Sequence, residues 1–325
     1  TGSGIDLTIT AGDTGDLNFV GAVGTGANPL GAIDITEARD LTANAIDAAS
    51  FQQSASFGTT TLNGAVNATG VVSITNELVN VNNTITTGVG DVELDATNGD
   101  LTIADGADIT TGTGNVVLAA SGGGITEIST QGDVLTGGGN VTFSSNTRLG
   151  PGGITVSTGA GAGDITFDGT LDGEVAGVEA LGLTAGSGDI AFNETVGSDV
   201  RMGAISIASA NDVEAQFAVS ATSISQTGGT GTTTFNGAKR NGRAPYIWEK
   251  ILNDLTAIEA RMETSKSGAD FSTSVMTIEI GPAHPAMHGI VRFTTHLDGE
   301  LIVGMDPEIG YLHRGFEKES ENSKW

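Results

Sequence analysis

A seven-residue motif, Gly-x-Gly-[Asp/Asn]-[Val/Ile]-x-[Leu/Phe], recurs five times along the chain. The Asp or Asn positions of successive copies are 24 or 25 residues apart. A period held this closely indicates a repeat architecture, in which each repeat forms one small structural unit. The five copies are Gly88–Leu94, Gly112–Leu118, Gly137–Phe143, Gly161–Phe167 and Gly186–Phe192.

Each copy predicts a tight turn followed by a short strand. Glycine adopts positive φ at little cost, and Asp or Asn favours a turn through its side chain. After the turn the residues alternate, so that Val92 and Leu94 share one face while Glu93 lies on the other. A coil of about 24 residues cannot bury its own apolar face, so neighbouring coils must stack it into ladders. The sequence therefore predicts a mainly β fold, a right-handed β-solenoid over residues 1–237.

Weaker patterns extend this interpretation to about ten coils. Residues 33–57 are richer in Ala, Asp and Gln, which leaves open a looser coil or a short helix. Gly58–Ala65 returns almost unchanged as Gly231–Ala238, which predicts that the repeats end at residues 238–245. Further strands are expected at Asp6–Ile9, Asp16–Phe19, Ile33–Ile35 and Val71–Ile74, with second strands of the repeats at Leu101–Ile103, Ile125–Ile128, Ile154–Val156, Leu181–Leu183 and Ile205–Ile207.

The charge distribution divides the chain at the same place. Residues 1–237 hold 26 of the 39 acidic residues and only three basic ones, a net charge of −23. Such a surface argues against binding to nucleic acid or to an anionic membrane. The chain has no cysteine, which excludes disulfides and thiolate metal sites. No apolar run reaches the ~18–20 residues of a membrane-spanning helix, and we expect the chain to begin inside a longer protein, because no signal peptide precedes the repeats.

Repeats rich in Gly, Thr, Asp and Asn, with strands such as Asp164–Phe167, resemble those of large secreted β-strand-repeat proteins. These include filamentous-haemagglutinin-like adhesins and autotransporter passenger domains. Over residues 1–237 the resemblance implies a structural or adhesive segment that is extracellular or displayed at the cell surface. Its partner would be an unknown surface ligand or further repeats of a larger protein.

Other roles of the repeats stay open at this stage. The recurring Asp and Asn positions are candidates either for Ca²⁺ binding between coils or for turn formation, and absence of the tandem Gly-Gly-x-Gly-x-Asp calcium motif favours turns. A polysaccharide-cleaving β-helix enzyme needs clustered carboxylates with basic partners, and three scattered arginines offer few. The Gly-x-Gly pairs lack the following helix that a dinucleotide-binding loop requires.

Residues 238–275 form a junction that contains a predicted amphipathic helix over residues 246–263. Its apolar residues recur every three or four positions, as expected for a packing helix: Ile247, Ile251, Leu255, Ile258 and Met262. Residues 276–325 then predict a small α+β fragment. Met276–Ile280 alternates as a strand, and Asp298-Gly299 separates Ile290–Leu297 from Leu301–Met305 as in a β-hairpin, before the start of a second helix.

The tail carries a specific set of motifs in a fixed order. About residues 275–325 resemble the N-terminal part of the 49-kDa subunit of respiratory complex I, which is the D-type subunit of NADH-quinone oxidoreductase. Ala283 stands where the familiar loop has Gln, and Phe316 stands where it usually has a small hydroxyl residue. The matching segments are Gly281–Gly289, Leu297–Glu300, Asp306–Gly310 and Leu312–Lys318.

The resemblance implies a quinone site in the tail. His284 and His288 would line the pocket for a ubiquinone or menaquinone headgroup, and His288 would hydrogen-bond or protonate the quinone, as an imidazole can near neutral pH. Arg314 would lie near an iron–sulfur cluster held by a neighbouring subunit, and other complex I subunits would be partners at the cytoplasmic face of the inner membrane. The two histidines flank Pro285 and lack further ligands at suitable spacing, so we expect no metal site there. Incidental turn residues are the remaining interpretation.

Two functional hypotheses follow from these two parts. The first is a secreted structural or adhesive β-solenoid that carries a non-functional fragment of a quinone oxidoreductase subunit, joined to it by an artefactual fusion. The walled cavity that a quinone needs, and the family's partner tyrosine, would lie beyond Trp325, so we expect no enzymatic activity from this chain alone. The alternative is the 49-kDa subunit of an NADH-quinone oxidoreductase, a complex that passes electrons from NADH through iron–sulfur clusters to quinone.

Overall fold

The computed structural model describes residues 4–24, 26–54, 57–122 and 126–237, together with the backbone of three strands near the C-terminus. The chain divides into two compact units, Thr1–Tyr246 and Ile247–Trp325. Every regular element among the described residues is a β-strand. The predicted junction at 238–275, the helix at 246–263 within it and the helix start after β30 lie outside the described residues.

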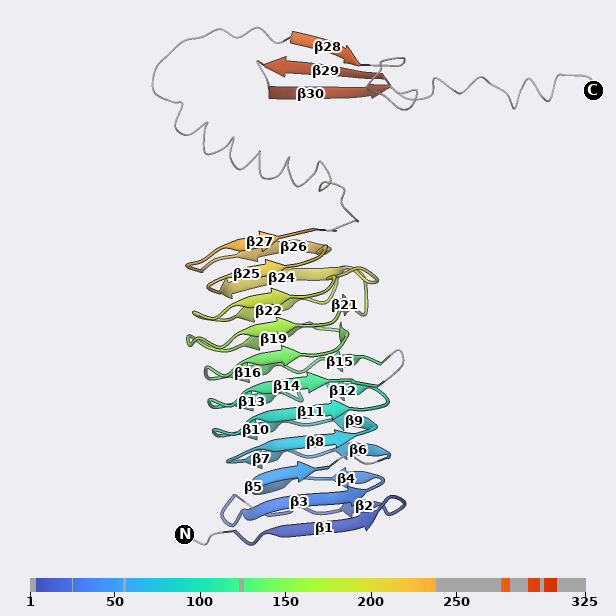
Figure 1. Ribbon diagram of the computed structural model, residues 1–325, viewed down its shortest axis with the longest axis vertical. Helices are drawn as coiled ribbons and strands as arrows, with labels where there is room; N and C mark the ends of the chain where they lie inside the picture. Colours follow the sequence, from blue (N-terminus) through green and yellow to red (C-terminus); the bar gives the residue numbers. More distant parts are fainter. Residues whose placement is uncertain are drawn as a thin grey trace, which may run out of the picture. The chain divides into compact units, whose positions relative to one another are not determined.

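Residues 4–237, here called the rod, form a parallel β-solenoid of about ten stacked coils (Figure 1). Each complete coil contributes short strands to three ladders. The first ladder is an eight-stranded sheet. It consists of β2 (Leu17–Phe19), β4 (Leu41–Ala43), β6 (Thr59–Leu62), β9 (Leu78–Val81), β12 (Leu101–Ile103), β15 (Ile128–Thr130), β18 (Thr147–Leu149) and β21 (Leu171–Gly173).

The second and third ladders join into one 19-stranded sheet, because β5 (Ile46–Gln53) pairs with both β7 and β8. The second ladder comprises β7 (Val66–Ala68), β10 (Ile85–Thr87), β13 (Ile109–Thr111), β16 (Val134–Thr136), β19 (Ile154–Ser157), β22 (Leu181–Thr184), β24 (Met202–Ser209) and β26 (Ala221–Gln226). The third comprises β1 (Leu7–Gly12), β3 (Leu30–Ala38), β8 (Val72–Asn76), β11 (Val92–Ala96), β14 (Val116–Ala119), β17 (Val141–Phe143), β20 (Ile165–Phe167), β23 (Ile190–Phe192), β25 (Val213–Ala215) and β27 (Thr233–Phe235).

The predicted stacking of like residues is confirmed in the third ladder. The first apolar position of each heptad pairs with that of the next: Val92, Val116, Val141, Ile165 and Ile190. The second apolar position does the same, and all of these residues are buried: Leu94, Leu118, Phe143, Phe167 and Phe192. The rings of Phe143 and Phe167 stack with centroids 4.6 Å apart, and those of Phe167 and Phe192 with centroids 5.4 Å apart. Because these buried positions pair in register, the core is continuous along the coil axis. Burying each such side chain contributes ~1.5–3 kcal/mol.

The short helix considered for residues 33–57 is wrong. The described part of this segment contains β3, β4 and β5. Buried positions alternate in β4, at Leu41 and Ala43, and in β5 the alternation shifts by one residue between Ala48 and Phe51. The period also shortens here, because Ile33 pairs with Phe51 and Phe51 with Val72. The spacing of 24–25 residues therefore holds for the heptad coils and not for the whole rod.

The predicted second strands do not form one row. Leu101–Ile103 belongs to the first ladder, whereas Ile154–Val156, Leu181–Leu183 and Ile205–Ile207 lie in the second. The reason is that a coil has three short strands rather than two. The two copies of the Gly-Thr-Thr-Thr segment differ in the same way, since the first contains β6 of the first ladder and the second contains β27 of the third.

In the second unit, the described strands form an antiparallel sheet in the order β28 (Met276–Ile280), β29 (Arg292–Asp298), β30 (Leu301–Glu308). Asp298, the last residue of β29, pairs with Leu301, the first residue of β30. The predicted strand and the predicted hairpin are confirmed, and β30 continues three residues past Met305.

Candidate functional site

The three residues predicted for the quinone site lie outside the described residues. His284 and His288 fall in the segment between β28 and β29, and Arg314 follows β30. The antiparallel pairing places Ile280, at the end of β28, beside Phe293 of β29. The roles of these three residues remain predictions.

In the rod, the Asp and Asn positions of the heptads form a ladder of hydrogen bonds. Oδ1 of Asp91 accepts the backbone N–H of Asn115 at 2.7 Å, and Oδ1 of Asn115 accepts that of Asn140 at 2.8 Å. The bond repeats through Asp164, Asp189 and Asp212 with distances of 2.8–2.9 Å. Each side chain therefore satisfies a backbone donor of the next coil. This geometry favours the turn role of these residues over Ca²⁺ binding.

The heptad glycines serve close packing of the backbone rather than positive φ. Of the two glycines that open each copy, only Gly186 has a positive φ. A Cβ added to Gly114 would lie 2.0 Å from the carbonyl oxygen of Gly90, and one added to Gly139 would lie 2.0 Å from that of Gly114. The expectation of positive φ was wrong at most positions, because the limiting factor is contact with the coil below.

A threonine that the sequence analysis missed completes this corner. Buried Thr87 and Thr111 donate their hydroxyls to the carbonyl oxygens of Gly90 and Gly114 at 2.6 Å. Thr136 and Thr158 repeat the bond at 2.5 and 2.7 Å. The signal was present in the sequence, since threonine directly precedes the first glycine of three heptads.

A second polar cluster is buried between β5, β6 and β8. Thr60 donates its hydroxyl to Oε1 of Gln53 at 2.6 Å, and Nδ2 of Asn76 donates to Oγ1 of Thr60 at 3.0 Å. Oδ1 of Asn76 accepts the backbone N–H groups of Gly58 and Glu77. Nε2 of Gln53 has no hydrogen-bond partner. These groups fix the packing of three strands and present nothing to solvent.

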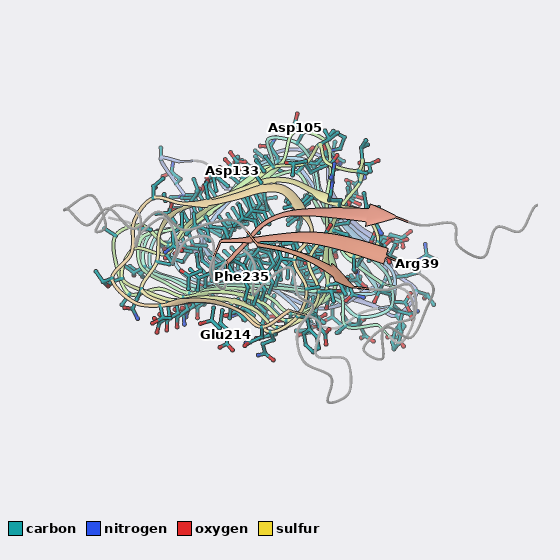
Figure 2. The ribbon with its side chains drawn as sticks, turned by 90° about the horizontal axis from the view of Figure 1, so that it is seen from above. Arg39, Asp105, Asp133, Glu214 and Phe235 are labelled. Carbon is teal, nitrogen blue, oxygen red and sulfur yellow. The ribbon has the colours of Figure 1, made fainter. Side chains whose placement is uncertain are left out.

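Most charged side chains of the rod are at least partly exposed, whereas Asp172 and Glu179 are buried. Seen along the coil axis, Arg39, Asp105, Asp133 and Glu214 point outward (Figure 2). Arg39 pairs with Asp16 at 2.8 Å. Within the described ranges no group of three or more His, Cys, Asp or Glu side chains is placed to hold a metal ion.

Half-buried Arg148 forms an ion pair with Glu127. Its Nε lies 2.9 Å from Oε1 of Glu127, and its Nη1 donates to the carbonyl oxygen of Gly173 at 3.1 Å. The hydrogen bond with Glu127 raises the pKa of Arg148, and burial partly opposes this effect. The arrangement links the three successive coils of β15, β18 and β21, and the charges of Asp172 and Asp199 also act on Arg148.

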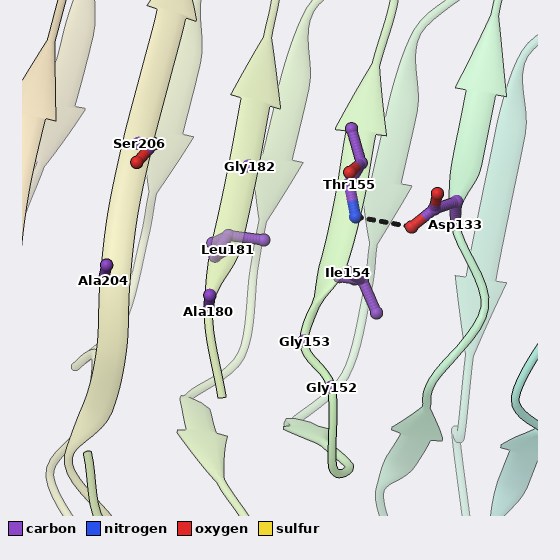
Figure 3. Close-up of a pocket in the computed structure, with 10 residues that line it drawn as sticks. All are labelled: Asp133, Gly152, Gly153, Ile154, Thr155, Ala180, Leu181, Gly182, Ala204 and Ser206. Atoms are coloured by element: carbon purple, nitrogen blue, oxygen red, sulfur yellow. Dashed lines mark hydrogen bonds between the residues drawn. The ribbon is translucent and has the colours of Figure 1, made fainter. Parts of the chain in front are cut away.

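The second ladder has a shallow groove of about 360 Å³ on its outward face (Figure 3). Thr155 and Ser206 flank Gly182 in register, and Gly182 has no side chain to fill the space between them. Asp133 lies at one end, where its Oδ1 accepts the backbone N–H of Thr155 at 2.7 Å. The rest of the lining is apolar and consists of Gly152, Gly153, Ile154, Ala180, Leu181 and Ala204. One carboxylate and two hydroxyl side chains therefore line this groove.

Comparison with known proteins found relatives for a short stretch only. The chain is 51% identical over 67 residues to the D-type subunit of NADH-quinone oxidoreductase from Myxococcus xanthus (strain DK1622), covering 21% of this chain and 16% of that protein. It is 53% identical over 57 residues to the second D-type subunit of the same enzyme from Anaeromyxobacter sp. (strain Fw109-5), covering 18% and 13%. It is 57% identical over 51 residues to the D-type subunit from Geotalea uraniireducens (strain Rf4), covering 16% and 13%.

The chain thus spans about a sixth or less of the length of these curated relatives. No protein-family model matches it, and no solved structure matches it. The resemblance to the D-type subunit that the tail motifs indicate is confirmed over this short stretch. Among the described residues there is no helix with the length and apolar character needed to cross a membrane.

Proposed function

We propose that the rod is a non-catalytic structural or adhesive module that is secreted or displayed at the cell surface. The tail carries a piece of a quinone-oxidoreductase subunit without acting as one. The observation that carries the first part is the use of the heptad carboxylates and amides as bridges between coils. Side chains engaged in this way build length and rigidity, and they leave a polar outer surface for contact with a partner.

The acidic surface suits a long rod that is exposed to solvent. A net charge of −23 without a single lysine in residues 1–237 keeps a long rod soluble and repels other copies. The two parts would work in different places, the rod outside the cell and the tail at the cytoplasmic face of the inner membrane. We infer that the two parts were joined by an artefactual fusion.

A second candidate function is that of the D-type subunit of complex I, and the short matches to that subunit favour it. In this case His284 and His288 would hold the quinone headgroup and Arg314 would lie near an iron–sulfur cluster. The matched stretch is short, and a quinone pocket needs walls on all sides. We therefore expect the purified chain to reduce no quinone. Reproducible reduction of a soluble quinone by this chain would refute the first proposal and favour the second.

Antibody labelling of the source cells tests the location of the rod. Antibodies against the rod should label intact cells or the culture medium. Label seen only after permeabilisation, together with co-purification of iron–sulfur subunits, would instead support the complex I role. Mass spectrometry tests the fusion through the tryptic peptide Met202–Lys239 together with missed-cleavage products that continue from it through Asn241–Arg243 and its neighbours, because only a continuous polypeptide contains residues from both sides of the junction.

A further inference from the structure

The groove over Gly182 is open because glycine has no side chain. The backbone at this position would also accept a larger residue. The φ of Gly182 is ordinary, and a Cβ added there would meet only Oγ1 of Thr155, at 3.5 Å, with the next atoms still farther away. The heptad glycines differ, since a Cβ at Gly114 would collide with backbone at 2.0 Å. The space above Gly182 is therefore available to a ligand, while the space at the heptad corners is filled by the neighbouring coil.

One end of the groove carries uncompensated negative charge. Asp133 uses Oδ1 to accept the N–H of Thr155, and Asp108, one coil earlier, uses Oδ1 to accept the N–H of Asp133 at 2.9 Å. Neither carboxylate forms an ion pair with an arginine of the described rod. Strands of a sheet lie about 4.8 Å apart, so the two charges are close neighbours. Their charge is available to a cation from outside the rod.

We propose that this groove receives the ammonium group of a lysine side chain from a partner protein. The Asp133 carboxylate supplies the charge and the hydroxyl of the adjacent Thr155 supplies a neutral acceptor, while Ser206 lies beyond Gly182 at the far end of the groove. An ammonium is compact and has three donors, and its four-carbon stem packs on Ala180 and Ala204. No aromatic ring lines the groove, so stacking of a sugar ring has no support. This inference rests on the proposed role of the rod as a binding surface.

The test is a titration of the full chain with the peptide tetralysine at 0.15 M salt, followed by backbone amide NMR. The amides of Thr155, Gly182 and Ser206 should shift in a saturable way. Asp133→Asn keeps the oxygen that accepts the Thr155 N–H but removes the charge, and it should weaken binding about fivefold, as for one exposed ion pair. Gly182→Leu fills the groove and should abolish the saturable shifts.

Two matched variants separate this site from general attraction to an acidic rod. Glu214→Gln removes one charge from the outer face of the third ladder, and Ala191→Leu adds the same side chain on that face. Both should leave tetralysine binding unchanged. Equal weakening by Glu214→Gln and Asp133→Asn would overturn the proposal, because it would show diffuse attraction only.

Calcium chloride provides a further control on the chemistry. Saturable shifts with millimolar Ca²⁺ that Asp133→Asn abolishes would replace the lysine site with a divalent-cation site and overturn the proposal. Asp133→Asn also tests the site should Gly182→Leu fail to fold. If the rod is labelled at the cell surface but its amide spectrum does not change with tetralysine, the lysine site is refuted and the proposed function stands. If tetralysine binds saturably but labelling is only intracellular, the proposed location is refuted and the lysine site stands.

Discussion

The rod satisfies buried polar groups in two different ways, at the heptad corners and in the cluster around Asn76. At the corners, each coil repeats one set of bonds, in which Thr111 caps the carbonyl of Gly114 and Asn115 bridges to Asp91. In the cluster, Gln53, Thr60 and Asn76 meet once, from three different strands. The repeated arrangement depends on backbone contacts between identical turns. The single arrangement depends on side chains that have no counterpart in other coils.

The difference has a cost that is visible in the structure. Asn76 uses both its amide N–H and its carbonyl oxygen, but Nε2 of Gln53 is buried without a partner. A buried donor without an acceptor costs about 1–3 kcal/mol. Repetition avoids such a residue, because every coil offers the same acceptors at the same height. The following experiments test this contrast, beginning with the largest expected effect.

Gly114→Ala should damage the heptad corner most. Its Cβ would lie 2.0 Å from the carbonyl oxygen of Gly90, so two coils must separate, and we expect a loss of more than about 3 kcal/mol in the free energy of unfolding. Urea unfolding followed by circular dichroism measures this. Gly182→Ala is the control, which should change stability by less than about 1 kcal/mol. Similar losses for the two variants would show that close coil contact is not what selects glycine.

Asn76→Ala should destabilise the cluster by about 3 kcal/mol. It removes the acceptor of the N–H groups of Gly58 and Glu77 and leaves a cavity. Asn80→Ala, at a half-buried outward position on the neighbouring β9, should change the unfolding free energy by about 0.5 kcal/mol or less. Equal effects of the two substitutions would mean that the cluster contributes nothing beyond surface packing.

Thr111→Val should cost about 1–3 kcal/mol. The shape is kept, but the carbonyl oxygen of Gly114 loses its hydroxyl donor. Thr110→Val, on the outward side of the same strand, is the matched control and should be nearly neutral. Thermal melting of both variants gives the comparison. If Thr111→Val did not change the stability, the Thr111 hydroxyl would not contribute to the heptad corner.

Gln53→Met should change stability by less than about 1 kcal/mol. The variant loses the bond from Thr60 but also removes the unpartnered Nε2, and the two effects oppose each other. Chemical denaturation of this variant beside Asn76→Ala tests whether Asn76 contributes more to stability than Gln53 does. A loss as large as that of Asn76→Ala would indicate a hidden acceptor for Nε2.

The smallest effect on stability is expected at Glu37, which belongs neither to the heptad corners nor to the cluster around Asn76. A hydrogen bond and charge repulsion from Asp13 raise the pKa of Glu37 above its usual value. A raised carboxyl pKa favours folding below the ordinary value of Glu, and this contribution is lost as the pH rises through the raised pKa. Asp13→Ala should return the Glu37 titration, followed by carboxyl carbon NMR, to its ordinary range. Asp16→Ala should leave it raised, because Asp16 faces Arg39.

The stacked ladders were predictable from the residues because they depend on local alternation and on one period. Val92, Val116 and Val141 occupy equivalent places in equal coils, so sequence spacing translates directly into contact. The hairpin of the second unit was predictable for a similar reason, since Asp298-Gly299 lies between two alternating strands. The predicted quinone residues depend on the resemblance of the tail, and the described residues do not include them.

The three-dimensional structure alone decided which ladder each remaining strand joins. Leu101–Ile103 and Ile154–Val156 look alike in sequence, but the first directly follows a heptad strand and the second comes one strand later, so they lie in different ladders. The same holds for the cluster of Gln53, Thr60 and Asn76 and for the groove over Gly182, which bring together residues from several coils. Alternation and period are local properties of the sequence. Which residues of different coils come into contact depends on how the coils stack, and this is decided only in the folded structure.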